Sequence, residues 1–130
     1  MRKLHFLIGL LGVLVFLFTG AYMNITFPGS YEGNEVIRYM YRANHVYLLM
    51  ASLVNLAISY YLYYSYLGWR RTCVHIGSIL LYLSPFVLTY AFFFEAPLAI
   101  PERNYTFLGV VLLVVGMVLH LPNIRINPKS

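Results

Sequence analysis

The sequence is poor in charged residues and in cysteine. Only 10% of its 130 residues are charged, and none is an aspartate. Soluble domains carry about a quarter charged residues, so this composition argues against a soluble globular protein. The single cysteine, Cys73, excludes an internal disulfide, a Cys-x-x-Cys redox pair and a cysteine-rich zinc site.

The sequence also lacks the usual patterns of enzymatic chemistry. No pair of carboxylates lies within an apolar segment, and there is no nucleophile elbow, phosphate-binding glycine loop or metalloprotease motif. We therefore predict no catalytic residue, and the sequence favours a protein that is not an enzyme.

Apolar residues are abundant instead. They make up 61% of the chain, and the mean hydropathy is +0.72. A helix needs about 20 mostly apolar residues to cross a bilayer, and four such segments lie near residues 4–23, 36–66, 73–94 and 104–121. The sequence predicts one domain over residues 1–130: an all-α membrane protein, folded as an up-down bundle of four transmembrane helices.

Local signals refine these segments. Pro28, Gly29 and Gly33 predict a loop over residues 24–34. Pro85 lies within the third segment, where it should kink the helix and free a backbone carbonyl. Asn104 is a suitable N-cap for the fourth segment.

The distribution of charge predicts the orientation in the membrane. Lysine and arginine collect on the cytoplasmic side of membrane proteins. With four spans, one side of the bundle holds Arg2, Lys3, Arg70, Arg71, Arg125 and Lys129, and the other holds all four glutamates with Arg38, Arg42 and Arg103. Both termini should therefore be cytoplasmic, in a bacterial inner membrane. This topology explains the net charge of +5, so we expect a lipid bilayer as partner and no nucleic acid.

Polar and small residues recur at helical spacing, so each segment has one polar face. Polar groups in a bilayer should face other protein segments, and these four faces should meet inside the bundle. On the second segment, Asn55 and Ser59 are expected to hydrogen-bond across helices, with Tyr82 or Thr89 as partners.

One candidate site lies near the outer surface. Arg38, Arg42 and His45 occupy successive turns of the second segment, and Glu95 ends the third segment at the same level. We predict an ion pair between Arg42 and Glu95. The cluster either locks the second helix to the outer loops, or binds an anionic headgroup, a carboxylate or a quinone carbonyl, with His45 as proton carrier.

A second candidate site lies at the cytoplasmic ends of the spans, where His5, His75 and His120 fall in one layer. Two facing histidines would suit a b-type haem, and Gly9, Gly12 and Gly116 would leave room for the porphyrin edge. The same glycines would equally allow close helix packing without a cofactor. A zinc or copper site of three histidines is less favoured, because no carboxylate lies on this side to support it.

These observations leave three classes of function open. The first is an accessory or scaffold subunit of an inner-membrane complex, bound to other membrane subunits or to itself. The second is an electron-transfer protein with haem b held by two of the three histidines. The third is a binder or enzyme for an amphiphile or quinone at the outer site.

Overall fold

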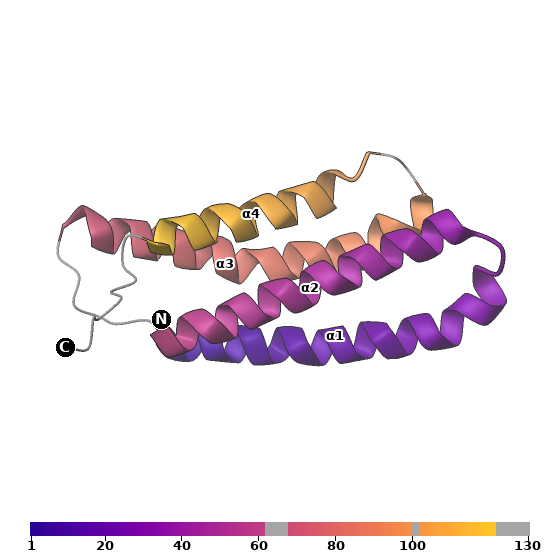
Figure 1. Cartoon of the computed structure of the whole chain (residues 1–130), viewed down its shortest axis with the longest axis horizontal. Coiled ribbons are helices and arrows are strands. Elements are labelled where there is room, and N and C mark those ends of the chain that lie inside the picture. The colour runs from indigo at the N-terminus through magenta and orange to yellow at the C-terminus, as the bar shows by residue number, and fades with distance from the viewer. Residues whose placement is uncertain (62–67, 100–101, 122–130) are drawn as a thin grey trace, which may run out of the picture.

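The computed structural model describes residues 1–61, 68–99 and 102–121. Within these ranges the chain forms α1 (Arg2–Ser30), α2 (Glu35–Tyr61), α3 (Trp69–Phe94), the short 3-10 helix η1 (Ala96–Leu98) and α4 (Asn104–His120), and it contains no strand. Successive long helices run in opposite directions (Figure 1). Helix α1 packs along α2, α3 packs along α4, and α2 also contacts α3. The predicted all-α fold with four long helices is confirmed.

The apolar surface of the helices faces outward. Helix α1 and the segment Trp69–Leu98 are each long and apolar enough to cross a membrane, and α4 is a shorter apolar helix. Large side chains such as Phe18, at 63% exposure, point away from the bundle, whereas His5 and Asn55 are fully buried. Soluble proteins place such groups the other way round.

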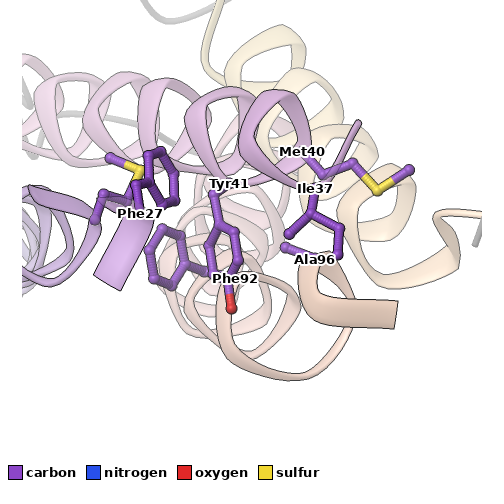
Figure 2. Close-up of a cluster of buried hydrophobic side chains, with 7 residues drawn as sticks. Phe27, Ile37, Met40, Tyr41, Phe92 and Ala96 are labelled. Atoms are coloured by element: carbon purple, nitrogen blue, oxygen red, sulfur yellow. The ribbon is translucent and has the colours of Figure 1, made fainter. Parts of the chain in front are cut away.

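The inner end of the bundle holds the start of α1, the end of α2, the start of α3 and the end of α4, and the outer end holds the opposite termini of these helices. At the outer end, Met23, Phe27, Tyr41 and Phe92 belong to one buried apolar cluster. The rings of Tyr41 and Phe92 lie 4.8 Å apart (Figure 2).

Some helix boundaries differ from the prediction. Helix α1 continues to Ser30, although a loop was expected from residue 24, because Met23 and Phe27 lie one turn apart and are both buried in the outer cluster. Tertiary packing thus outweighs the local preference of Pro28 and Gly29. Helix α3 begins at Trp69, four residues earlier than expected, directly after Gly68 with its positive φ of 66°. The predicted end of the second span, near residue 66, lies outside the described residues.

Candidate functional site

One side chain from each long helix meets at the inner end: His5, Asn55, Ser78 and His120. All four are buried. His5 Nδ1 lies 2.8 Å from Asn55 Oδ1, and His5 Nε2 lies 3.0 Å from Ser78 Oγ. Ser78 Oγ is also 3.3 Å from Nε2 of His120, whose Nδ1 is 2.8 Å from the Gly116 carbonyl oxygen. We call these four residues the histidine cluster.

The orientation of Asn55 follows from its backbone contacts. Its Nδ2 donates to the carbonyls of Ala51 and Leu81, each at 2.9 Å. The Leu81 carbonyl is the one that Pro85 leaves without a helical N–H donor, as the sequence predicted. Both amide hydrogens are thus used, and the amide oxygen turns towards His5.

Other polar groups close the inner end around this cluster. The ring of Tyr82 lies 4.4 Å from that of His5, and the Tyr82 hydroxyl donates to the Met1 carbonyl at 3.3 Å. Arg2 Nε donates to the Ser59 carbonyl at 2.9 Å. The expected pairing of Asn55 with Tyr82 or Thr89 is therefore wrong, since Asn55 crosses to His5 and to a backbone carbonyl.

The structure brings together two of the three predicted histidines. His75 is exposed on α3, although it was predicted on the inward face, because the buried positions of that turn are Val74, Gly77 and Ser78. His5 and His120 do meet, with ring centroids 5.9 Å apart. The hydroxyl of Ser78 contacts Nε2 of both rings, and Nδ1 of both faces an oxygen.

This arrangement does not fit haem. Bis-histidine ligation requires an iron and a flat porphyrin between the two rings, and Ser78 occupies the point where both Nε2 atoms converge. The space beside the glycines that was expected to admit the porphyrin is also occupied by neighbouring helices. A Cβ on Gly9 would lie 2.9 Å from the Leu56 backbone nitrogen, a Cβ on Gly12 would collide with Ser52, and a Cβ on Gly116 would lie 3.0 Å from the Gly77 carbonyl oxygen. These glycines serve close helix packing.

At the outer end, Arg38, Arg42 and His45 lie on the side of α2 that faces α1, but they contact different residues. Arg38 pairs with Glu35 at 2.9 Å. The guanidinium carbons of Arg38 and Arg42 lie 5.5 and 5.9 Å from the centroid of the Phe27 ring.

His45 contacts α1 further along the bundle. Its ring stacks on Phe16 with centroids 4.0 Å apart. The Thr19 hydroxyl donates to the Phe16 carbonyl, so it accepts from His45 Nδ1 at 2.9 Å. His45 therefore contacts Phe16 and Thr19, whereas the two arginines contact Phe27.

The predicted ion pair between Arg42 and Glu95 is wrong. Arg42 is exposed, and the buried carboxylate of Glu95 caps the start of α4 instead. It accepts from the backbone N–H groups of Tyr105 and Thr106, each at 2.9 Å, and from the Thr106 hydroxyl at 2.5 Å. Glu95 thus replaces Asn104, the predicted N-cap, because Asn104 itself is already the first helical residue.

The arginine that joins this region is Arg103, which the sequence analysis did not select. Its guanidinium donates to Asn44 Oδ1, and to the Thr106 hydroxyl at 3.2 Å. Asn44 is fully buried on α2, so these contacts connect α2 to the start of α4. We call Asn44, Glu95, Arg103 and Thr106 the outer network. The sequence signal that could have indicated this network was the presence of Glu95 and Arg103 within the ten residues before Tyr105.

Comparison with known protein families, curated proteins and solved structures finds no match to this chain. Among residues 1–61, 68–99 and 102–121, no three histidine, cysteine or acidic side chains group as metal ligands would. The chemistry of the two polar clusters therefore follows from their own contacts.

Proposed function

We propose that the chain is an integral membrane protein whose four helices cross the bacterial inner membrane, with both termini cytoplasmic. The main support is the distribution of polar side chains, which is the reverse of that in soluble proteins: leucine, valine and phenylalanine are exposed and the histidine cluster is buried. Polar groups in lipid must find partners within the protein, and these groups do. The basic residues at the inner end support the proposed orientation.

A groove at the inner end is consistent with a position in a lipid bilayer. It lies between α1 and α2, encloses about 920 Å³, and is lined by Arg2 and Lys3 beside Phe6, Leu7, Leu56, Ser59 and Tyr60. Apolar walls beneath two basic residues suit the chains and the phosphate of a lipid at the cytoplasmic surface.

We further propose that the protein acts as an accessory subunit of a membrane complex. The side chains of its interior polar clusters bond mainly to its own helices, although Asn44 Nδ2 and Arg103 Nε have no partner among the described residues, so we assign contacts with other proteins to the outer surface. Tyr90 contacts two other exposed rings there: its centroid lies 4.6 Å from that of Phe94, on which it stacks, and 4.9 Å from that of Tyr105. Aromatic side chains are enriched in protein interfaces, and this aromatic ridge on α3 and α4 is the proposed contact surface.

Cysteine labelling tests the proposed topology. In a Cys73→Ser background, Glu32→Cys should react with a membrane-impermeant maleimide in intact spheroplasts, and Arg71→Cys should react only after permeabilisation. Both positions are exposed, so accessibility within the protein does not differ between them. Labelling of both positions in intact spheroplasts would contradict the proposal.

Native electrophoresis of mildly solubilised membranes tests the accessory role. A tagged chain expressed from its own locus should migrate with a larger complex, and Tyr90→Ala should release it. Phe18→Ala, which removes an even more exposed ring from α1, is the control. Migration at the size of the free chain, or equal loss with both variants, would argue against the ridge as a subunit contact.

A further inference from the structure

The histidine cluster forms one continuous chain of polar contacts. It runs from Asn55 Oδ1 through the His5 ring, the Ser78 hydroxyl and the His120 ring to the Gly116 carbonyl oxygen. The four distances along it lie between 2.8 and 3.3 Å, and the side chains involved are buried. Each contact needs one hydrogen to be a hydrogen bond.

Both ends of this chain are acceptors. Asn55 presents its oxygen because its amide hydrogens are donated to Ala51 and Leu81. Gly116 presents a backbone carbonyl oxygen. The facing nitrogen, Nδ1 in both histidines, must therefore carry the hydrogen.

The two contacts of Ser78 with the histidines then have only one hydrogen between them. A neutral histidine with its hydrogen on Nδ1 has only a lone pair on Nε2. Two such lone pairs, from His5 and His120, point at Ser78, whose hydroxyl has a single hydrogen to donate. One of the two contacts is thus left without a hydrogen while both histidines are neutral.

We propose that the histidine cluster is a binding site for one proton. The proton, taken from water, forms an N–H bond with the lone pair of Nε2 in one histidine. If His5 takes it, His5 donates to the serine oxygen and the serine hydroxyl donates to His120; if His120 takes it, both bonds reverse. All four contacts are hydrogen bonds in either form, and rotation of the Ser78 hydroxyl exchanges the two.

The surrounding charges limit the site to a single proton. Among the described residues at this end, the Met1 ammonium, Tyr82 and the histidines themselves act on or contact the two rings. Arg2 and the half-buried Cys73 lie at the same end, as do the exposed Lys3, Arg70, Arg71 and His75. From α2, the cluster meets the uncharged Asn55. The glutamates lie at the outer ends of the helices. A second proton would place two imidazolium rings 5.9 Å apart beside the Met1 ammonium and would leave the serine hydrogen without an acceptor.

Nitrogen NMR of the intact protein in phosphatidylcholine nanodiscs tests this site. With ¹⁵N-labelled histidine, the ring shifts report which nitrogen carries a hydrogen. His45→Gln removes one of the other two signals, and exposed His75 supplies the remaining one. At high pH, His5 and His120 should both carry hydrogen on Nδ1 alone. On acidification, both should shift in one common step that adds one proton in total.

In the protein with Ser78 intact, three results would overturn the proposal. They are a hydrogen on Nε2 of either ring at high pH, two independent one-proton steps, and no change in either ring at any pH at which the protein stays folded. Ser78→Ala should split the common step into separate responses of the two rings. Ser84→Ala removes another buried α3 serine, one that donates to the Gly109 carbonyl at 2.9 Å, and should keep the common step. A common step that survives Ser78→Ala would also overturn the proposal.

Discussion

Asn55 of α2 supplies the hydrogen bond that Pro85 removes from α3. Proline has no backbone N–H, so the carbonyl of Leu81, four residues earlier, loses its helical donor. The Asn55 amide donates to that carbonyl at 2.9 Å, and the oxygen of the same amide lies 2.8 Å from His5 Nδ1. A local break in one helix thereby fixes the orientation of a histidine in another.

This relationship predicts energetic coupling between Asn55 and Pro85. Asn55→Ala should destabilise the protein by about 1–3 kcal/mol, because the Leu81 carbonyl and His5 Nδ1 both lose a partner. In a Pro85→Ala background the backbone N–H of residue 85 is restored, and the loss should be smaller by at least about 0.5 kcal/mol. Denaturant unfolding in detergent micelles measures all four members of the cycle.

Thr89 provides the control for that cycle. Its hydroxyl donates to the Pro85 carbonyl within α3 and has no contact with Asn55. Thr89→Ala combined with Asn55→Ala should therefore give additive losses of stability. Additivity between Asn55 and Pro85 as well would show that the amide does not replace the missing helical donor.

The sequence predicted the free carbonyl near Pro85 but not its partner. The loss of a helical N–H is a covalent property of proline and can be read from one residue. Which side chain reaches the exposed carbonyl depends on the register between α2 and α3, and this register follows from the packing of both helices. Thr89, one of the expected partners, bonds within its own helix instead.

The outer site shows the same limit. Helical spacing placed Arg38, Arg42 and His45 on the inward face of the second segment; in the structure all three contact α1 and Arg42 is exposed, while Glu95 is the C-cap of α3. Helical spacing could not show that this side of α2 faces α1, whereas the side with Asn44 faces α4. Successive residues of a helix point in directions about 100° apart. Arg42 and Asn44, two residues apart, therefore contact different helices.

The outer network predicts that Glu95 has a large effect on stability and Glu102 a small one. Glu95→Ala removes the acceptor of two backbone N–H groups at the start of α4, and loss of such a cap costs about 1–2 kcal/mol. Glu102 is exposed, so Glu102→Ala should change stability by less than about 0.5 kcal/mol. Thermal unfolding followed by circular dichroism compares the two. Equal effects would mean that the Glu95 carboxylate does not cap α4.

Arg103 and Arg42 should also differ. Arg103→Met removes a half-buried guanidinium that donates to Asn44 and Thr106, and leaves those buried acceptors with one donor fewer, at a cost of about 1–3 kcal/mol. Arg42→Met removes an exposed guanidinium that lies over Phe27, a contact worth about 0.5–1 kcal/mol. The same unfolding measurement applies. A larger loss with Arg42→Met would restore Arg42 as the residue that joins α2 to the outer end.

The packing of α1 against α2 predicts opposite responses to a methyl group at two glycines of α1. A Cβ on Gly9 would lie 2.9 Å from the Leu56 backbone nitrogen, which cannot move without shifting α2. Gly9→Ala should therefore destabilise the bundle by about 1–3 kcal/mol. Gly29 has no heavy atom within 4 Å of the added Cβ, so Gly29→Ala should be neutral or stabilise the helix by up to about 1 kcal/mol. Unfolding in micelles of both variants separates these outcomes, and a neutral Gly9→Ala would show that α1 and α2 do not approach this closely.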